Sequence, residues 1–529
     1  MQKYNFFGKK ISGKFTIPSG IVTTNVSVIE KIASEVPQIG ILTTKSIGLE
    51  QRDGNREPII AGHSPFSFVN AVGLTNPGAK NFANNLSKIK IPNDKFLLIS
   101  IFGKDEKDFL ETAKILYNFA DGFEVNLSCP HASRYGQAIG KDLNLVKKII
   151  KNVSSLGKPV FAKISPNLDI KESVLAMVNG GASGIVAINT KGPEEVLFDN
   201  FFVLSNKKGG VSGRAILETG IECVKKIRKI TDIPIIACGG ISRAKDIEKY
   251  KKAGANFFGV GSALAGMSTK EIKEYFLLLE KDIKEDSENA ENMLKKDLNI
   301  NYKKYKIREN KKLEENLFIL EMEDEIKADP GQFVFTWLPE KGEKPFSIFD
   351  DSPLKFLIQK RGCFTEKLSK LRKGDDIYLR GPYGNSPKIC GKTLLVGGGT
   401  GIAALYLFAK RNKESVALLG GKDKKCLLAA KGFSSFCKDV FFVTENGEIG
   451  KKGLVTDLLE KVIKETKPKY CINCGPKAMV DAVCVEEQKY ILPKNIYSSV
   501  EFLTKCGIGL CGSCATSDGK RSCVDGTFF

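Results

Sequence analysis

Eight short apolar runs within roughly the first 280 residues constrain the fold more than any other feature of this sequence. Each run is followed by a segment with helical periodicity, and this alternation is typical of βα units that build a parallel sheet. The runs lie at 19–22, 39–44, 96–101, 122–127, 159–164, 184–188, 234–238 and 257–261. Because eight parallel strands close a TIM barrel, we predict an α/β fold that begins with a TIM (β/α)8 barrel.

Polar and reactive residues lie within the last positions of these runs or just after them, at the end of a TIM barrel where active sites lie. They are Lys45, Ser46, Ser100, Asn126 with Cys129, Lys163, Asn189 with Thr190, Gly239 with Gly240, and Gly261 with Ser262. Loops that serve only as turns would not repeat such residues. The glycines after the last two runs precede helix starts, where backbone amides bind phosphate, and GGVSGRA at 209–215 extends this pattern. These loops favour a phosphate-bearing cofactor.

Four cysteines near the end of the sequence have the spacing Cys506-x4-Cys511-x2-Cys514-x8-Cys523. Plant-type ferredoxins bind a 2Fe-2S cluster with C-x4-C-x2-C and one more distant cysteine. The small residues between these cysteines let the backbone approach the cluster. A zinc knuckle prefers two C-x2-C pairs, and a disulfide framework is the other alternative. We predict that these four cysteines are the metal ligands of a 2Fe-2S cluster, and therefore that the protein transfers electrons.

Composition and charge narrow the class of protein further. A chain of 529 residues, 42% apolar and 27% charged, predicts several domains of an ordinary globular protein. We expect a cytoplasmic protein with no membrane partner, because the sequence opens without a signal peptide and lacks a stretch of about 18 apolar residues. The net charge of +20 comes from lysines spread along the chain. This pattern indicates a solvated surface that steers anionic substrates, and we expect no nucleic-acid partner.

Six motifs of the barrel region occur in the order found in one enzyme family. They are TTKSIGLEQRDGN (43–55), NAVGLTNPG (70–78), EVNLSCP (124–130), FAKISPN (161–167), AINT (187–190) and GGVSGRAI (209–216). This region resembles the class 1 dihydroorotate dehydrogenases. The resemblance implies an FMN on the open face of the barrel and oxidation of dihydroorotate to orotate in pyrimidine (UMP) biosynthesis. It also suggests a homodimer formed through the barrel.

The resemblance implies roles for individual residues. Cys129 falls on the catalytic base. The substrate positions are Lys45, Asn70, Ala71, Val72, Gly73, Leu74, Asn126, His131, Asn189 and Thr190. The FMN positions are Ser19, Lys45, Ser46, Ser100, Asn126, Lys163, Ile188, Gly213, Gly239, Gly240, Gly261 and Ser262.

The residue types suit this chemistry. Forming the ring double bond removes a proton and a hydride from neighbouring carbons, so a base must work opposite a flavin. A tuned thiol can be that base, and carboxamides can donate to and accept from a pyrimidine ring. The alternatives are that Cys129 is a small buried apolar residue and that Lys45 and Lys163 are surface lysines.

One position departs from the family. The usual SCPN reads SCPH here, which places His131 where a substrate-binding asparagine is expected. The similar flavin domain of dihydropyrimidine dehydrogenases carries the same SCPH. An oxidoreductase acting on another pyrimidine is therefore an alternative, and His131 can also be a structural histidine.

The sequence beyond the barrel predicts an electron-transfer module. We expect the barrel over 1–283, a charged linker over 284–302, an antiparallel β-barrel over 303–389, a small α/β nucleotide-binding domain over 390–495 and the cluster-binding segment over 496–529. The turn GGGTG within 392–410 is not the G-x-G-x-x-G fingerprint and is a weak dinucleotide signal. In C-x2-C at 471–474, Cys471 is interpreted as strand packing and Cys474 as part of a turn before a helix.

Residues 303–529 resemble the ferredoxin-reductase-like subunit of the NAD-linked class 1B dihydroorotate dehydrogenases. The motifs are GQFV, KPFSI, GPYGN, LLVGGGTGIAAL, CGPKAM and CGIGLCGSC. The resemblance implies FAD, a 2Fe-2S cluster and NAD, with electrons passing from FMN through the cluster and FAD to NAD in a fusion of two subunits. A different electron acceptor is an alternative. A further alternative is an adaptor whose barrel only docks.

The FAD positions implied by this resemblance are Lys344, Pro345, Phe346, Ser347 and Thr365. Lys344 replaces an arginine of the family motif, and Gln359 occupies a second arginine position. Lysine cannot make the bidentate phosphate contacts of arginine. Phe364 replaces a glycine, and we expect it to block the close approach of the backbone to FAD.

Overall fold

The computed structural model describes residues 3–127, 137–499 and 503–529, so the predicted base Cys129 and the predicted substrate residue His131 lie outside the described residues. The chain divides into two compact units. Unit 1 comprises Met1–Ile300 and Ile508–Arg521, and unit 2 comprises Asn301–Gly507 and Ser522–Phe529. Part of the C-terminal cysteine segment therefore folds with the N-terminal unit.

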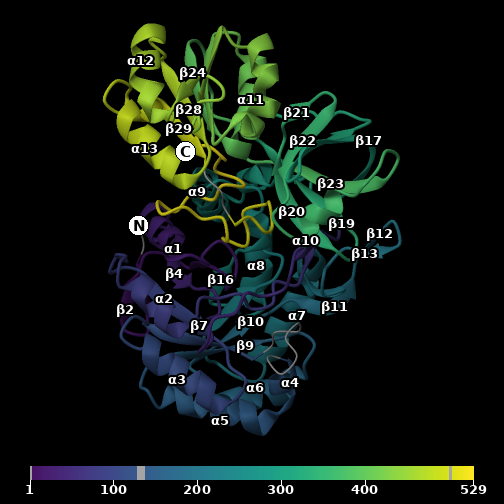
Figure 1. Ribbon diagram of the computed structural model, residues 1–529. Helices are drawn as coiled ribbons and strands as arrows, with labels where there is room; N and C mark the ends of the chain where they lie inside the picture. Colours follow the sequence, from purple (N-terminus) through teal and green to yellow (C-terminus); the bar gives the residue numbers. More distant parts are fainter. Residues whose placement is uncertain (1–2, 128–136, 500–502) are drawn as a thin grey trace. The chain divides into compact units, whose positions relative to one another are not determined.

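Unit 1 contains the predicted closed barrel of eight parallel strands, in the order β10-β15-β16-β3-β4-β7-β8-β9 (Figure 1). The strands are β3 (Phe15–Ile17), β4 (Ile39–Thr43), β7 (Phe96–Ile101), β8 (Gly122–Asn126), β9 (Val160–Ile164), β10 (Gly184–Ala187), β15 (Ile235–Cys238) and β16 (Phe257–Gly259). Most are continuous buried runs, as expected for parallel strands that are covered on both faces. The predicted TIM-barrel fold is confirmed.

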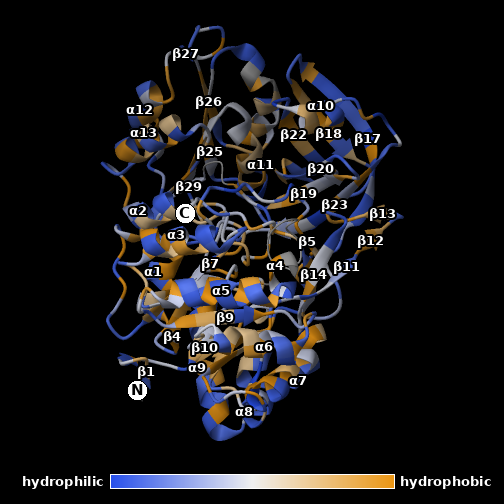
Figure 2. Ribbon diagram, turned by 90° about the horizontal axis from the view of Figure 1, so that it is seen from below, coloured by the Kyte–Doolittle hydropathy of each residue, from blue (hydrophilic) through white to orange (hydrophobic). Residues whose placement is uncertain are grey.

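A helix follows each barrel strand before the next one begins. The helices are α1 (Val26–Glu35), α2 (Ala79–Leu86), α3 (Glu106–Leu116), α4 (Gln137–Lys141), α5 (Leu143–Ser154), α6 (Ile170–Asn179), α7 (Leu217–Arg228), α8 (Ala244–Lys252) and α9 (Thr269–Glu285). In α5 the Asp142 side chain caps the first turn, accepting from the Leu145 amide at 3.0 Å. Figure 2 shows α5 as alternating hydrophilic and hydrophobic turns beside the hydrophobic β9, because one helix face packs on the barrel.

The first barrel strand does not lie where the sequence predicted it. We expected a strand over 19–22, whereas β3 covers Phe15–Ile17 and pairs with β4 and β16. Pro18 ends the strand, and Gly20 and Val22 have φ of +84° and +57°, which no strand residue adopts. Residues 19–22 are therefore a loop at the open end of the barrel.

An N-terminal hairpin packs against the barrel core. Strands β1 (Tyr4–Phe6) and β2 (Lys9–Ile11) pair antiparallel. The Phe6 ring lies 4.7 Å from the ring of Phe96 and 4.6 Å from that of Phe257, both edge-on, so these three aromatic side chains form part of one buried cluster.

A four-stranded antiparallel sheet, in the order β11-β14-β6-β5, adds to the loops that follow the barrel strands. Its strands are β5 (Ile60–Gly62), β6 (Ser67–Asn70), β11 (Lys191–Glu195) and β14 (Lys208–Gly213). A short hairpin joins β11 to β14 through β12 (Leu197–Phe198) and β13 (Phe201–Phe202). The sheet places Asn70 opposite Gly210 and Ser67 opposite Gly213.

The segment predicted as a linker carries structure of its own. The 3-10 turn η3 (Asn289–Met293) follows α9, and the buried Asp282 carboxylate accepts from the Ala290 amide at 2.7 Å and from the Ser287 hydroxyl at 2.6 Å. Unit 1 continues to Ile300. Charged residues of this segment also pair with α8 and its cap, Glu288 with Lys245 at 2.8 Å and Glu291 with Arg243 at 3.0 Å.

Unit 2 begins with a seven-stranded antiparallel sheet in the order β20-β19-β23-β17-β18-β22-β21. Its strands are β17 (Lys303–Glu314), β18 (Leu317–Met322), β19 (Phe333–Leu338), β20 (Gly342–Ser347), β21 (Asp350–Asp351), β22 (Leu354–Gln359) and β23 (Asp376–Tyr383), with the short helix α10 (Cys363–Leu368) after β22. Alternate apolar residues of β17 and β18 build a buried core with Phe356 and Leu379. The antiparallel strands expected from the period-two pattern are confirmed.

A six-stranded sheet in the order β27-β26-β25-β24-β28-β29 completes unit 2, and every strand pair in it is parallel. Its elements are β24 (Thr393–Gly398), α11 (Ile402–Arg411), β25 (Ser415–Gly421), β26 (Asp439–Thr444), β27 (Lys451–Lys452), α12 (Thr456–Thr466), β28 (Tyr470–Cys474), α13 (Lys477–Glu487) and β29 (Ile496–Ser499). The predicted small α/β fold is confirmed. Cys471 is buried within β28, and Cys474 ends that strand.

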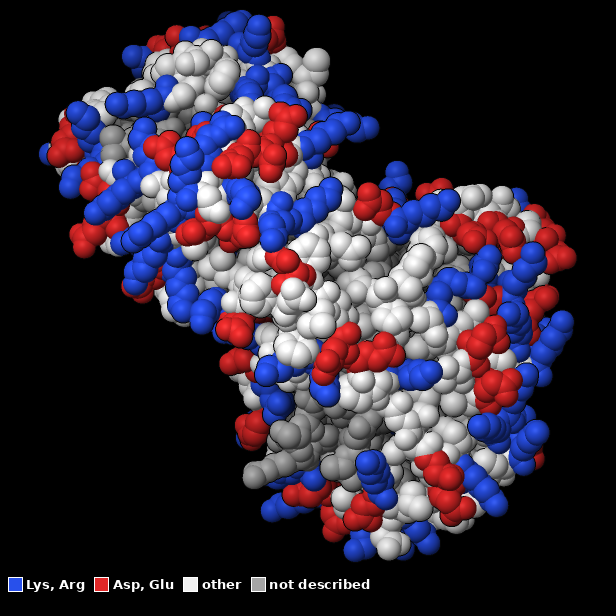
Figure 3. Space-filling view, turned by 90° about the vertical axis from the view of Figure 1, so that its right-hand side faces the viewer, with Lys and Arg blue, Asp and Glu red and all other residues white. Residues whose placement is uncertain are grey.

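The surface carries its excess of positive charge in a dispersed form. On the face drawn in Figure 3, Lys and Arg side chains alternate with Asp and Glu side chains, and many lysines are paired within their own helix, as Lys464 is with Glu460 at 2.5 Å. Within the described parts of the chain, no helix is both long and apolar enough to cross a membrane.

Candidate functional site

Three polar side chains lie buried side by side inside the barrel of unit 1. Ser100 on β7 donates from its hydroxyl to Glu124 Oε1 on β8 at 2.7 Å, and Lys163 Nζ on β9 lies 3.5 Å from the same oxygen. All three residues are almost fully buried. They come from three adjacent strands. Their side chains can meet because alternate residues of each strand face the barrel interior.

A chain of hydrogen bonds continues from Ser100 to the loops that follow the strands. Ser46 Oγ lies 2.9 Å from Ser100 Oγ and 3.0 Å from Ser19 Oγ. Asn126 donates from Nδ2 to Ser46 Oγ at 3.0 Å, and Asn189 Nδ2 donates to Asn126 Oδ1 at 3.4 Å. The structure thus brings together residues that were predicted, far apart in the sequence, to contact FMN or substrate.

Both predicted lysines are buried. Lys45 follows β4, and its backbone amide donates to the Thr23 carbonyl at 3.2 Å. Lys45 is 6% exposed and Lys163 is 4% exposed, which excludes the alternative that they are surface lysines. A Cβ added to Gly20 would lie 3.4 Å from Lys45 Nζ, so the glycine keeps space for this ammonium group. Buried ammonium groups at the open end of the barrel are suited to binding anionic ligand atoms.

The predicted phosphate loops follow β15 and β16, which are neighbours in the barrel. Within the described part of the chain, the backbone amides of Gly240, Ile241, Gly261 and Ser262 donate to no protein acceptor. Gly239 and Gly240 have φ of +117° and +74°, in the region that favours glycine. Two adjacent loops with available amides can hold a phosphate group.

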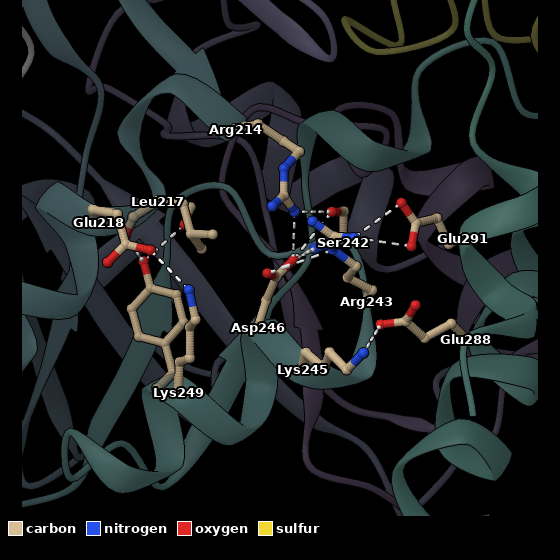
Figure 4. A network of polar contacts seen from close by, with 12 residues as sticks. Arg214, Leu217, Glu218, Ser242, Arg243, Lys245, Asp246, Lys249, Glu288 and Glu291 are labelled. Carbon is tan, nitrogen blue, oxygen red and sulfur yellow. Dashed lines mark hydrogen bonds and ion pairs between the residues drawn. The ribbon is translucent and has the colours of Figure 1, made fainter. Parts of the chain in front are cut away.

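A network of polar side chains holds the first of these loops in place (Figure 4). The buried Asp246 carboxylate accepts from the amide of Ser242 at 3.0 Å, from its hydroxyl at 3.1 Å, and from Arg214 Nη1 at 2.8 Å. Tyr250 donates to the Gly239 carbonyl at 2.7 Å. At the rim, Arg243 pairs with Glu291 at 3.0 Å. These bonds fix the Gly239 carbonyl and Ser242, on either side of Gly240 and Ile241. The backbone amides of Gly240 and Ile241 are therefore held in place for a ligand.

The remaining predicted substrate and FMN residues lie around the added sheet. Asn70 ends β6 and donates from Nδ2 to the Gly210 carbonyl at 3.2 Å, and the Ala71 amide donates to the Ile59 carbonyl at 2.8 Å. Three others have constrained backbone geometry: Gly73 and Leu74 have φ of +82° and +57°, and a Cβ at Gly213 would lie 2.2 Å from the Phe66 carbonyl oxygen. Three predicted positions remain. Val72 is half-buried. The Ile188 amide donates to the Cys238 carbonyl at 2.9 Å, and the Thr190 amide donates to Asn189 Oδ1 at 2.9 Å.

Two buried groups near this network were not predicted as site residues. Cys238 ends β15, and burial raises the pKa of its thiol to about 12, so it stays protonated and is not a base. Glu124 was missed although it lies within the EVNLSCP motif. An acid two residues before Asn126 on a buried strand was the signal, because residues i and i+2 of a strand face the same side.

In unit 2 the predicted FAD residues lie on two neighbouring elements. Lys344, Pro345, Phe346 and Ser347 belong to β20. Thr365 Oγ1 accepts from the Arg361 amide at 2.9 Å and from the Gly362 amide at 3.2 Å at the start of α10. The Phe346 and Phe364 rings stack at 6.4 Å, which brings the two motifs together.

The expected obstruction by Phe364 is wrong. Its ring is buried in the core of the antiparallel sheet, where apolar contacts hold it. A Cβ added to the neighbouring Gly362 would meet nothing within 4 Å. The backbone of this turn therefore stays open, because the aromatic side chain points into the core.

The weak glycine signal in the α/β part of unit 2 gains support from its position. The sheet order reverses at β24, which lies between β25 and β28, and ligands of open α/β sheets bind at such a switch point. Gly399 and Gly401 follow β24 directly. A Cβ at Gly401 would lie 2.5 Å from the Cys474 carbonyl oxygen, so only glycine fits against the end of β28.

The four predicted cluster cysteines are all buried, and Gly507, Gly509 and Gly512 between them have positive φ. Arg380 Nη1 donates to the Cys506 carbonyl at 2.8 Å, and Arg521 Nη1 donates to the Gly509 carbonyl at 2.7 Å. The residue types and the backbone suit a cluster. Over the described ranges, however, no group of three or more His, Cys, Asp or Glu side chains is set to hold a metal ion.

The C-terminal segment within unit 1 is hydrogen-bonded to the barrel loops. The Val22 amide donates to the Leu510 carbonyl at 2.7 Å, and the Gly266 amide donates to the Ile508 carbonyl at 2.9 Å. Arg521 Nη2, fully buried, donates to the Met267 carbonyl at 2.8 Å. These loops follow β3 and β16, so Cys511 and Cys514 lie in a segment attached at the open end of the barrel.

A closed βα barrel with buried lysines, linked carboxamides and two amide-lined loops at one end is the arrangement of a barrel enzyme that binds a phosphate-bearing cofactor. The sequence profile described as dihydroorotate dehydrogenase matches residues 1–276. The chain belongs to the dihydroorotate dehydrogenase family, whose members are enzymes and oxidoreductases.

Curated relatives agree with the profile. The chain is 38% identical over 270 residues to the protein named dihydroorotate dehydrogenase B (NAD(+)), catalytic subunit, of Methanocaldococcus jannaschii, covering 50% of this chain and 87% of that one. A protein of the same name from Pyrococcus abyssi is 38% identical over 280 residues, covering 52% of this chain and 92% of the relative. A chain of an NADH-dependent reduced ferredoxin-NADP oxidoreductase structure is 31% identical over 42% of this chain and 87% of its own length, with a TM-score of 0.39.

Proposed function

We propose that this protein oxidises dihydroorotate to orotate in pyrimidine biosynthesis. Family membership supports the reaction, and the relatives in Methanocaldococcus and Pyrococcus are named as NAD(+)-linked dihydroorotate dehydrogenases. The single observation that carries the proposal is the connected polar network at the open end of the barrel, which joins Ser46, Asn126 and Asn189 beside the amide-lined loops.

The oxidation removes one proton and one hydride from the substrate ring. We assign Cys129 as the base that takes the C5 proton on its thiolate sulfur. FMN, when bound, supplies the acceptor for the two electrons that leave with the C6 hydrogen. The amides of Gly240 and Gly261 are suited to its phosphate, and Lys163 to its ring.

The other polar groups orient the substrate. Asn70, Asn126 and Asn189 offer carboxamides that can donate to and accept from the ring amide groups of dihydroorotate. The buried ammonium of Lys45 is suited to the substrate carboxylate, since a charge-assisted hydrogen bond is strongest away from water. Deep burial of the Lys45 ammonium and of the substrate carboxylate would exclude water from the reacting carbons.

We further propose that unit 2 receives the electrons. In this scheme a 2Fe-2S cluster on Cys506, Cys511, Cys514 and Cys523 carries single electrons to FAD, and NAD is the final acceptor. The burial of the four thiols and the switch-point position of Gly401 support it. The chain would then be a natural or engineered fusion of a catalytic and an electron-transfer subunit.

Two further expectations complete the proposal. The enzyme would work in the cytoplasm, where a reducing environment keeps its 14 cysteines as thiols or metal ligands. Its barrel would pair with a second copy to form a homodimer. Light scattering of the purified protein measures this, and a mass of one chain would contradict it.

The decisive experiment is an anaerobic titration of the full chain with dihydroorotate and then with NAD, recorded as absorbance of flavin and of the iron-sulfur cluster. We expect dihydroorotate to bleach flavin and cluster, one orotate to form for every two electrons stored, and NAD to restore the colour. A protein that forms no orotate would refute the proposed reaction. Reoxidation by another carrier but not by NAD would refute the acceptor alone.

Two controls assign substrate and base. Dihydrouracil in place of dihydroorotate tests the alternative raised by His131, and bleaching by dihydrouracil alone would make that alternative correct. In Cys129→Ser we expect bleaching by dihydroorotate to slow by at least about a hundredfold, the usual contribution of a general base. An unchanged rate would show that Cys129 is not the base.

A further inference from the structure

Glu124 is a buried carboxylate at the centre of the polar network, and the proposed reaction assigns it no role. It lies on β8 and is 1% exposed. It stands two residues before Asn126, so both side chains face the barrel interior, with Glu124 one layer further from the open end. A buried charge in such a position needs compensating partners.

Its partners are the residues that the flavin site needs. Glu124 Oε1 accepts from the Ser100 hydroxyl at 2.7 Å and lies 3.5 Å from Lys163 Nζ, and both side chains of this ion pair are at most 5% exposed. Through Ser100 the contact continues to Ser46. The Glu124 carboxylate therefore connects two parts of the network: the Lys163 ammonium and the hydroxyl groups of Ser100 and Ser46.

We propose that Glu124 is a positioning residue that sets the electron affinity of the flavin through Lys163. This inference rests on the proposed function, because it requires a flavin in the barrel. Glu124 holds the Lys163 ammonium in one place and offsets its positive charge. The reacting flavin then experiences the field of the pair rather than that of an isolated lysine.

A flavin gains negative charge when it is reduced. A positive charge nearby stabilises the reduced form, and a negative charge nearby disfavours it. At the low effective dielectric of a buried site, a unit charge several ångströms away has a large effect. Neutralising Glu124 removes one negative charge from beside the Lys163 ammonium, so the flavin should become easier to reduce.

The test uses the full chain with Glu124→Gln. Glutamine keeps the length of the side chain and an oxygen that can accept from Ser100, and it removes only the charge. The matched control is Glu222→Gln, which breaks the exposed 2.8 Å ion pair of Glu222 with Lys225 on α7 of the same unit. The measured quantities are bound FMN per chain and the ratio of reduced to oxidised FMN against a reference dye.

We expect E124Q to bind FMN and to raise the ratio of reduced to oxidised flavin roughly tenfold at a fixed dye potential. E222Q should match the unaltered protein. In Glu124→Asp the charge remains but the shorter side chain moves away from Lys163, so we expect a smaller change in the same direction. This second variant keeps the test available if E124Q does not fold.

The outcomes separate the two proposals. A flavin ratio equal to that of E222Q, in either flavin-loaded variant, overturns the role of Glu124 and leaves the proposed function standing. An unaltered protein that neither contains nor binds FMN overturns the proposed function, and with it this inference. A changed ratio together with an unchanged KM for dihydroorotate supports a role toward the flavin rather than toward the substrate.

Discussion

Each unit of the molecule contains a buried ion pair, and the two pairs are built differently. In unit 2, Arg380 and Glu343 are fully buried and joined by two hydrogen bonds of 2.6 and 2.7 Å. Arg380 also donates to Tyr383 and to the Cys506 carbonyl. In unit 1, Lys163 and Glu124 are joined by one contact of 3.5 Å. The first pair holds two chain segments together, and the second leaves its cation at the edge of the candidate functional site.

The choice of cation explains the difference. Arginine keeps its charge at all ordinary pH values and makes planar bidentate bonds, so it suits a permanent buried joint. Here that joint ties β20 and β23 to the segment that carries Cys506, the first of the predicted cluster cysteines. Lysine is a compact charge on a flexible stem, which suits a group that has to respond to a ligand.

Breaking the arginine pair should have the largest effect on stability. In Arg380→Met the Glu343 carboxylate is left buried without its cation, and we expect unit 2 to lose about 3–5 kcal/mol of unfolding free energy. Trp337, the single tryptophan of the chain, is buried on β19 and reports unfolding of this unit by fluorescence. The control is Arg308→Met, which breaks a half-exposed pair with Glu321. Equal denaturation midpoints for the two variants would contradict the prediction.

A third buried acid, Glu487, extends the comparison of the two ion pairs, because the hydrogen-bond partner described for it is a neutral amide and not a cation. Glu487 on α13 is fully buried and accepts from Asn473 Nδ2 at 2.6 Å. Burial raises the pKa of its carboxyl from 4.5 to about 7. The folded protein thus binds this proton more tightly than the unfolded chain does, so its contribution is favourable at low pH and is lost as pH rises.

We therefore expect unit 2 to lose roughly 2–3 kcal/mol between pH 4.5 and pH 8 from this group. Most of the loss falls below pH 7, since the unfolded carboxyl ionises first. The measurement is urea denaturation followed by Trp337 fluorescence across this range. Glu487→Gln should flatten the dependence, and an identical pH profile for the variant would show that Glu487 is not its source.

Removing the charge of the lysine pair should cost less than removing that of the arginine pair. In Glu124→Gln the amide oxygen still accepts from the Ser100 hydroxyl, so the network keeps this hydrogen bond and loses only the carboxylate charge. We expect a loss of about 1–2 kcal/mol in unit 1, measured as the far-UV circular dichroism transition not shared with Trp337 fluorescence. Glu343→Gln is the matched variant in unit 2. A larger loss for E124Q than for E343Q would reverse the comparison.

The smallest expected effect concerns one hydrogen bond between each ion pair and a neutral hydroxyl group. Tyr383→Phe removes an acceptor 3.0 Å from Arg380 Nη1, and Ser100→Ala removes the donor to Glu124. We expect each to cost about 1 kcal/mol, by the same two measurements. If neither variant changes the free energy of unfolding, the ion pairs do not depend on these hydroxyl groups.

The sequence predicted much of the fold, and the reason is local. Seven barrel strands lie at the predicted runs because buried parallel strands are continuous apolar stretches bounded by turns. The first barrel strand, β3, was misplaced because Phe15–Ile17 is very short and the apolar residues Ile21 and Val22 that follow it belong to a loop. The glycine turn after β24 was weak as a motif and gained support only from the sheet order.

The candidate site was predicted less completely. Lys45, Lys163 and Asn126 were predicted because they lie at or near the ends of strands, whereas Glu124 and Arg380 were not predicted. Their importance depends on which side chains face them across neighbouring strands, and that is set by register. Likewise, the expectation for Phe364 failed because a side chain's direction follows from packing rather than from motif position.

The sequence by itself determined the βα alternation, the glycine loops and the cysteine spacing, since these depend on residue type and distance along the chain. Only the tertiary structure decided that Ser19, Ser46 and Asn126 share one network, and that Ile508–Arg521 folds with unit 1. It also decided which buried charges meet. Pairing across strands brings together residues far apart in sequence. Burying a charge costs free energy unless an opposite charge lies beside it, and this favours the pairing of the buried charges in both ion pairs.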